Sequence, residues 1–442
     1  MQTGFPKLYE DQRAELTPYL NDQSIQTTTH SRPRDLAARA DMVKAAAVIL
    51  ILIAAVLISG RAGADESPAY KVVVYSPHYN HNEDASEYNQ LFKKDLEKYW
   101  NGNVIELRHF RQDFVGFHDQ ISDEIEALAA DPLIRALVIG EGLPGTLTGI
   151  TSLRAKRPDI FVIVIDPHED LETTTRVATL TVTLNNAARG YIFPTMANRM
   201  GARTLIYFSL PRHQEIPFIA RQKRILSAVS RDMGMIMVSD LTAPDPALNT
   251  DRESIKKYFE KAVDVYMERY GQEVAFISTS TVHSDILIPI VMQKGGNVLE
   301  AIQSSPLLGF PEALGLTPEA KALFGRWHDL LTLEDEKYME LDPRGGFTLW
   351  TYPYPHTVVL SMVDIAIAAL EDRADIYDLK GVSTALEKYS PGAKWLVSTI
   401  MNYKTNTVMP QAVLVLQDTY WLGHGYQGFT RLNIPTKYYR IQ

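Results

Sequence analysis

From Lys71 onward, short runs that are apolar throughout alternate with longer stretches that are apolar only at every third or fourth position. Continuous apolar runs of this length indicate strands that are buried on both faces of a parallel sheet. The second pattern indicates amphipathic helices. Strands are predicted at 71–75, 104–107, 134–139, 160–165, 178–184, 204–208, 235–238, 274–277 and 412–416. Helices are predicted at 86–100, 117–130, 146–156, 185–201, 219–233, 252–270, 284–294 and 357–370.

This alternation predicts an α/β fold in which helices cover both faces of parallel sheets. The strand and helix rhythm runs once up to residue 184 and starts again at residue 204. A chain of 442 residues also exceeds what one hydrophobic core normally supports. We therefore expect two Rossmann-like lobes.

A different pattern precedes the first predicted strand. Residues 45–58 form an unbroken apolar run after Lys44, and Ala62-Gly63-Ala64 follows it. At about 1.5 Å per residue the run is too short for a bilayer core of about 30 Å. It is typical of a secretory signal peptide, predicted at 42–64 with cleavage after Ala64. The alternative is an uncleaved N-terminal membrane anchor, and the polar residues 1–41 are expected to be a disordered extension or to precede the true start at Met42.

Composition excludes several classes of function. The net charge is −9, so no broad basic surface is available for nucleic acid. The chain has no Cys, which excludes thiol catalysis, Cys-based zinc sites, disulfides and a lipid anchor on Cys. We expect an acidic, exported protein that stays out of the membrane once the signal is cleaved.

Candidate ligand-binding residues follow from the strand ends, because ligands of open parallel sheets bind beyond the carboxyl ends of the strands. Small polar side chains stand at most of these ends, although Ser, Thr, Asp and Asn are also common helix caps and turn formers. Aromatic residues near Pro-rich turns, such as Tyr352, are candidates for stacking on a flat ligand or for packing between lobes. The predicted binding set is Ser76, His78, Tyr79, Glu141, Asp166, His168, Asn185, Ser209, Asp240, Ser278, Thr279 and Tyr352. Asn186, Arg212, His213, Thr242 and Ser280 stand at the same strand ends.

Two motifs leave an enzyme or a metal-binding protein open as the alternative. Gly140-Glu141-Gly142-Leu143-Pro144-Gly145 has the spacing of a dinucleotide fingerprint, but it follows the third strand, and Pro144 lacks an N–H for a phosphate. The loop with His78, His81, Glu83 and Asp84, and the stretch 168–170, contain metal-ligating residue types without a known spacing. A nucleophile elbow and a P-loop are both missing. No catalytic residue, metal or cofactor is therefore predicted.

The stretches VTLNNAARG at 182–190 and MANRMGARTLI at 196–206 carry a family resemblance. They are similar to the end of lobe one, the crossover helix and the first strand of lobe two in type I periplasmic binding proteins. Residues 221–234 resemble the next helix of that family. The resemblance is strongest over residues 70–300, and the chain also resembles, more closely, an uncharacterised group of exported bacterial binding-protein-like proteins.

The resemblance implies two lobes joined by a multi-strand hinge, with the ligand enclosed between them. Lobe one is then expected at 65–190 plus 345–385, and lobe two at 201–340 plus 386–442. The family's ligand positions correspond to Ser76, His78, Glu141, Asp166, Ser209, Asp240 and Ser278. The chain departs from the family in its missing lipobox Cys, in Asn185 where an Asp is usual, and in the segment 311–343, expected to be an extra helix pair.

The implied function is capture of a small polar ligand for a membrane permease or receptor, outside the cytoplasm. A repressor with the same fold is disfavoured, because the N-terminal region resembles a signal peptide rather than a helix-turn-helix. The exported enzyme or metal-binding protein remains the alternative function.

Overall fold

The computed structural model describes residues 70–76, 83–100, 104–110, 116–248, 250–302, 307–402, 405, 407–428 and 433–441. The predicted signal peptide, the N-terminal extension, and the candidates His78 and Tyr79 lie outside these ranges. Residues 67–442 form one compact unit. In the described part of the chain, no helix is both long and apolar enough to cross a membrane.

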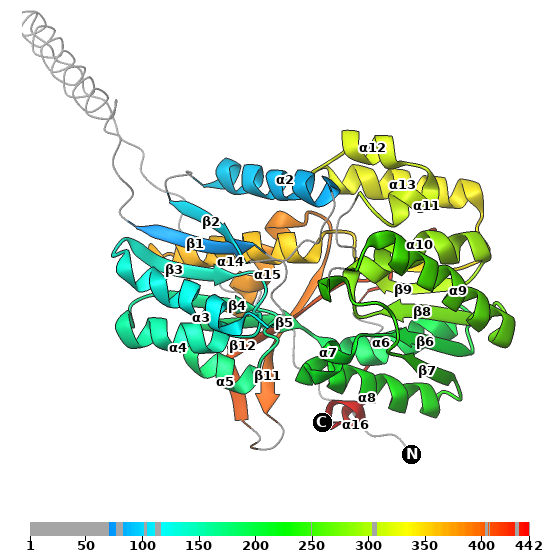
Figure 1. Ribbon diagram of the computed structural model, residues 1–442, viewed down its shortest axis with the longest axis horizontal. Coiled ribbons are helices and arrows are strands. Elements are labelled where there is room, and N and C mark those ends of the chain that lie inside the picture. The colour runs from blue at the N-terminus through cyan, green and yellow to red at the C-terminus, as the bar shows by residue number, and fades with distance from the viewer. Residues whose placement is uncertain are drawn as a thin grey trace, which may run out of the picture. The chain divides into compact units, whose positions relative to one another are not determined.

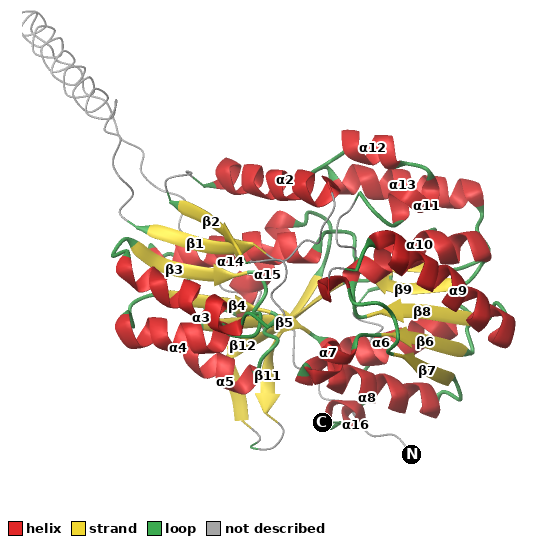
Figure 2. Cartoon of the chain, viewed as in Figure 1, coloured by secondary structure: helices red, strands yellow, loops and turns green. Residues whose placement is uncertain are grey.

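The first lobe is built on a seven-stranded sheet with the order β11-β12-β5-β4-β3-β1-β2 (Figures 1 and 2). All neighbours are parallel except β11 and β12. Its strands are β1 (Lys71–Ser76), β2 (Ile105–His109), β3 (Ile134–Ile139), β4 (Phe161–Ile165), β5 (Leu180–Leu184), β11 (Trp395–Asn402) and β12 (Thr407–Gln417). The helices of this part are α2 (Glu83–Tyr99), α3 (His118–Glu126), η1 (Ala127–Ala130), α4 (Thr146–Lys156), α5 (Leu171–Val177), α14 (Tyr354–Leu370) and α15 (Leu379–Tyr389).

The second lobe has a seven-stranded sheet with the order β14-β13-β10-β9-β8-β6-β7. Its strands are β6 (Thr204–Phe208), β7 (Ile236–Asp240), β8 (Val274–Ser278), β9 (Asn297–Ala301), β10 (Phe347–Leu349), β13 (Tyr420–Trp421) and β14 (Gly425–Tyr426). The remaining helices are α6 (Asn186–Arg199), α7 (Pro211–Glu215), α8 (Pro217–Asp232), η2 (Pro246–Leu248), α9 (Arg252–Tyr270), α10 (Thr281–Lys294), α11 (Phe310–Leu314), α12 (Thr317–Ala322), α13 (Trp327–Leu341) and α16 (Thr436–Tyr439). The expected extra helix pair at 311–343 is thus three helices, α11, α12 and α13.

The order of elements makes the chain cross between the sheets at 185–203, 350–394 and 418–419. This arrangement confirms the predicted two-lobe α/β fold. The expected division of the C-terminal segments needs correction, however. Strand β10 belongs to the second sheet, whereas β11 and β12 belong to the first, because the apolar run 412–415 pairs in parallel with 181–184 of β5.

The strands are continuously apolar because helices cover both faces of each sheet. In β1, Val72 and Val74 pack in one cluster with residues of α14, whereas Val73 and Tyr75 pack in another with Ile121 of α3. Successive side chains of a strand point to opposite faces, so one strand contributes to two hydrophobic layers. These layers hold the strand ends, where the functional site lies, in fixed positions.

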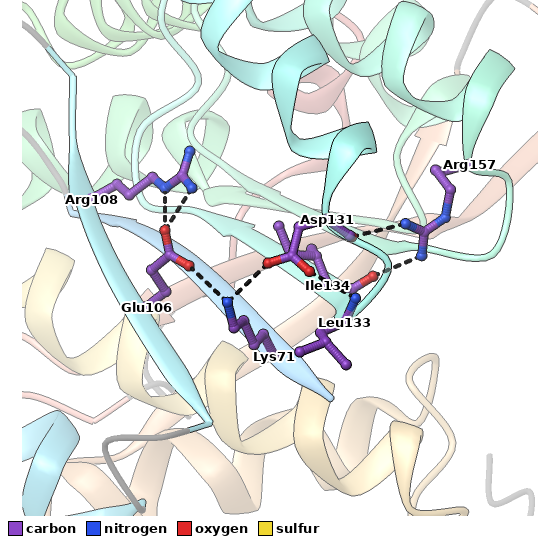
Figure 3. Close-up of polar contacts among 7 residues, drawn as sticks. All are labelled: Lys71, Glu106, Arg108, Asp131, Leu133, Ile134 and Arg157. Carbon is purple, nitrogen blue, oxygen red and sulfur yellow. Dashed lines mark hydrogen bonds and ion pairs between the residues drawn. The ribbon is translucent and has the colours of Figure 1, made fainter. Parts of the chain in front are cut away.

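The amino ends of the first lobe's strands carry a polar network (Figure 3). The Lys71 ammonium pairs with Asp131 at 2.9 Å and lies 3.9 Å from a Glu106 carboxylate oxygen. Arg157 donates to the main-chain oxygens of Asp131 and Ile134, at 3.0 and 2.9 Å. Partly exposed ion pairs of this kind contribute little stability. The network therefore orients the strand starts, and it lies at the opposite end of the strands from the ligand candidates.

Candidate functional site

A cleft of about 220 Å³ is lined by residues of both lobes. On the first lobe it is bounded by the residues that follow β3 and β4, together with the start of α14. On the second lobe it is bounded by the end of β8, the start of α10, and α7 and α8. The lining therefore combines carboxyl ends of parallel strands with helix N-termini, where backbone N–H groups lack intrahelical partners.

Asp166 is the acidic residue that directly follows β4 and lines the cleft. Its Oδ1 accepts hydrogen bonds from the Leu184 backbone N–H at 3.0 Å and the Thr183 hydroxyl at 2.9 Å. Its φ is +42°, which is unusual for a residue other than glycine. Burial, to which the nearby charge of Glu141 adds, raises the pKa of Asp166. A carboxyl group is thus held at the cleft wall in a strained backbone conformation.

The turn with dinucleotide-like spacing serves a structural purpose at its helix end. One Glu169 carboxylate accepts hydrogen bonds from the backbone N–H groups of Gly145 and Leu147, at 3.2 and 2.7 Å. These are the donors that a pyrophosphate would need at the start of α4. The turn nevertheless places Gly140 and Glu141 on the cleft, where Glu141 lies 3.0 Å from His168 Nε2.

Thr279 is the centre of a hydrogen-bond network on the second lobe. Its hydroxyl lies 2.8 Å from the Ser209 hydroxyl and 2.8 Å from His213 Nδ1. Gln214 donates to the same Ser209 hydroxyl at 2.7 Å. Burial, reinforced by the charge of Arg212, lowers the pKa of His213 well below 6.5. The His213 side chain is therefore neutral at physiological pH and offers the cleft hydrogen bonds rather than charge.

The crossover helix α6 supplies the charged and amide groups at the hinge side. The Arg189 guanidinium pairs with the buried Glu300 carboxylate at 3.0 Å and lies over the rings of Phe193 and Trp350. Asn186 accepts a hydrogen bond from Gln222 of α8 at 2.8 Å. The buried Glu300 carboxylate thus balances the charge of Arg189, whose side chain also lines the cleft.

The structure brings together five residues of the predicted binding set on the cleft lining, namely Glu141, Asp166, His168, Ser278 and Thr279. Ser209 lies directly behind Thr279. Ser76 is buried at the end of β1 and is not among the residues that line the cleft. A ligand contact by any of the five stays a prediction.

Three other candidates serve the fold where they stand. Asn185 caps α6 by accepting a hydrogen bond from the Ala188 N–H at 3.0 Å, and its neighbour Asn186 lines the cleft. The Asp240 carboxylate is held by hydroxyl groups of its own lobe: those of Tyr258, Tyr266 and Thr242. Tyr352 donates its hydroxyl to the Pro391 oxygen at 2.6 Å and lines a smaller neighbouring cavity.

The cleft also contains residues that the strand-end rule did not select. Arg189, Phe193 and Gln222 lie within helices, and Tyr207 lies within β6 rather than at its end. Tyr354, which also stands beside a Pro-rich turn, begins α14 at the cleft wall. Arg189 and Gln222 could have been found in the sequence only as polar residues at positions where the helical pattern places buried side chains.

The metal alternative gains no support from the described ranges, in which no group of three His, Asp or Glu side chains could hold an ion. In the stretch 168–170, each residue has a different partner. His168 pairs with Glu141, Glu169 caps α4, and Asp170 caps α5 by accepting from the Thr173 N–H. The loop that begins at His78 lies outside the described residues.

Replacing Thr279 with valine is expected to lower the free energy of unfolding by about 1–3 kcal/mol, because two buried polar partners lose their hydrogen bonds. The change keeps the side-chain shape and removes only the hydroxyl. Urea unfolding measures the effect. Thr281→Val is the control, since Thr281 also lines the cleft but makes no hydrogen bond of its side chain within the described part, and it should change stability by less than about 0.5 kcal/mol. Equal effects of the two variants would contradict the network's role.

The two mostly parallel sheets and the cleft lined by both lobes correspond to the fold of type I periplasmic binding proteins. The chain belongs to a family described as proteins of unknown function (DUF3798), whose model matches residues 70–344. An uncharacterised protein of Treponema pallidum (strain Nichols) is 30% identical over 190 residues, which are 43% of this chain and 86% of the relative.

Solved structures are similar in fold. A protein described as a candidate transcriptional regulator from Clostridium difficile 630 has a TM-score of 0.60 at 16% identity, covering 80% of this chain and 99% of that one. A glucose-galactose binding protein from Geobacillus stearothermophilus has a TM-score of 0.45 at 14% identity, covering 70% of this chain and 93% of that one. At 16% identity, the likeness to the first of these structures shows the fold alone.

Proposed function

We propose that the chain is an extracytoplasmic, non-catalytic binding protein that captures one small polar ligand between its lobes for a membrane permease or receptor. The observation that carries the proposal is the cleft itself, whose lining joins Asp166 and Glu141 of one lobe to the Thr279 network of the other. A ligand that bonds to both walls favours the closed arrangement of the lobes by its differential contacts. The signal-like pattern at 42–64 supports export.

The chemistry of the walls supports a polar ligand. Arg189 and Arg212 are each balanced by a carboxylate, Glu300 at 3.0 Å and Asp245 at 2.6 Å. The aromatic side chains of Phe193, Phe218 and Tyr354 provide apolar faces beside these groups. Such a combination suits a compact molecule with several hydrogen-bonding groups and one flat or apolar face.

A thermal-shift screen of the purified chain tests the proposal. Sugars, nucleosides and amino acids are the probes, and a ligand present at a hundred times its Kd stabilises the native state by about 2.7 kcal/mol. Stabilisation by one of these classes supports capture of a solute. Stabilisation only by NAD, or only by zinc with reversal by a chelator, would instead support the enzyme or metal-binding alternative.

Asp166→Asn is expected to weaken binding of the ligand found in that screen by about tenfold or more, because a charge-assisted hydrogen bond contributes about 1.5–3 kcal/mol. Asparagine tolerates positive φ, so the backbone at 166 keeps its conformation. Titration calorimetry measures the change. Asp372→Asn is the matched control, since Asp372 also has positive φ, at +54°, but is exposed and distant from the cleft lining. Unchanged affinity in the Asp166 variant would remove Asp166 from the site.

A further inference from the structure

A second cavity, of about 30 Å³, adjoins the cleft and shares Ile302 and Tyr354 with its lining. Helix α13 forms one wall through Trp327, Leu330, Leu331 and Glu334. The segment 349–354, which leads from β10 into α14, forms the other wall. The two cavities have side chains in common, so the side cavity lies directly beside the cleft.

Glu334 is the acidic residue of the side cavity. It lies on the buried face of α13, in helical register with Trp327, Leu330, Leu331 and Tyr338, where the pattern predicts an apolar residue. Its side chain is almost completely buried and makes no hydrogen bond or ion pair with the described part of the chain. Burial alone raises the pKa of Glu334 to about 8. Burying a carboxyl group without a hydrogen-bond partner destabilises the folded protein. Its position beside a cavity therefore suggests that the cavity binds a group that pairs with it.

Both walls of the side cavity also contribute aromatic side chains. Trp327, Trp350, Tyr352 and Tyr354 all line it. The rings of Trp350 and Tyr354 meet edge to face with centroids 5.5 Å apart, and the Tyr352 hydroxyl is fixed by the Pro391 oxygen. The faces of aromatic rings attract cations, and rings around a carboxylate are the usual surroundings of a bound organic ammonium group.

We propose that the side cavity is a subsite for an ammonium or monoalkylammonium group, which pairs with the Glu334 carboxylate and lies among the aromatic rings. The small volume suits a single head group rather than a whole solute. The cation supplies a partner for Glu334, which has none in the described part of the chain. The same chemistry can come from a free small cation or from the amino end of a larger ligand held in the cleft.

The test is titration of the full chain with methylammonium chloride at pH 7.5, followed by tryptophan fluorescence, with sodium chloride and methanol as the salt and neutral controls. We expect saturable binding of methylammonium in the wild type and in Glu336→Gln, an exposed carboxylate on the same helix. Binding should be at least tenfold weaker in Glu334→Gln. Pairing ionises Glu334, so calorimetry should also detect proton release in the wild type.

A wild type that responds equally to methylammonium and sodium would overturn the proposal. Equal responses to methylammonium and methanol, or an unchanged affinity in Glu334→Gln, would overturn it as well. None of these results depends on whether the cleft captures a solute.

The two sources of the group are separated by comparing glucosamine with methylammonium in a second variant, Gln222→Leu, which alters the cleft but not the side cavity. Tighter binding of glucosamine that is lost in both Gln222→Leu and Glu334→Gln assigns the group to a cleft ligand; this assignment rests on the proposed function. Binding of methylammonium alone, retained in Gln222→Leu, assigns the subsite to a free cation. Either result supports the subsite.

Discussion

Replacing Glu334 with glutamine is expected to flatten the pH dependence of stability between about pH 5 and pH 8. The pKa of this carboxyl is raised from 4.5 to about 8 in the folded protein. Between these values the folded state holds a proton that the unfolded state has released, so the wild type loses stability as pH rises. The loss is complete above about pH 8 and amounts to roughly 2–5 kcal/mol, at about 1.4 kcal/mol per pKa unit. The variant has no carboxyl group at this position, so it should not show this loss of stability as pH rises.

Urea midpoints of the wild type and of Glu334→Gln at several pH values provide the measurement. The quantity to compare is the slope with pH, because the new amide adds a constant cost of its own. The other titratable groups of the side cavity are Tyr352 and Tyr354, and burial raises the pKa of both, so they stay neutral in this range. The exposed Glu336→Gln should follow the wild type. Parallel curves for the wild type and Glu334→Gln would show that Glu334 ionises normally in the folded protein.

Most elements between residues 70 and 295 could be predicted closely from the sequence, because their strands are short apolar runs; the short helices α5 and α7 were not predicted. The strands predicted at 134–139 and 204–208 are β3 and β6 with the same bounds. The region after residue 295 was harder. Strand β9 contains Asn297 and Glu300, and β11 has an exposed edge with Leu396, so neither is a continuous apolar run. Their pairing depends on contacts between distant segments, which local patterns do not record.

The sequence could predict the candidate site only through one rule, that ligands bind beyond the carboxyl ends of parallel strands. It placed Asp166 and Thr279 on the cleft, since β4 and β8 end there. Asp240 also follows from this rule but is not among the cleft-lining residues, and tyrosines of α9 donate to its carboxylate. The rule could not select Arg189 or Gln222, because they lie within helices and line the cleft only through the packing of α6 and α8 in the folded protein. Glu334 breaks the apolar pattern of α13, and that break was the signal for the side cavity.

Substituting Arg189 with methionine is expected to cost about 3–5 kcal/mol of stability, because it leaves the Glu300 carboxylate buried without its cation. Glu300 is only 2% exposed and also accepts a hydrogen bond from Thr419 at 2.5 Å. The double variant Arg189→Met with Glu300→Gln should recover part of the loss, since no unpaired charge remains. Urea unfolding of the two single variants and the double variant gives the coupling energy between the residues.

The exposed pair Arg203 and Glu273 is the matched control. Its atoms are also close, at 2.9 Å, but its side chains are 81% and 60% exposed, so Arg203→Met should cost less than about 1 kcal/mol. A loss in Arg189→Met no larger than in Arg203→Met would contradict the buried-pair argument. The position of the buried pair gives the measurement a further meaning. Arg189 and Thr419 lie on two of the three segments that cross between the sheets, and Glu300 joins them, so the loss of stability in Arg189→Met includes the loss of a contact between two crossing segments.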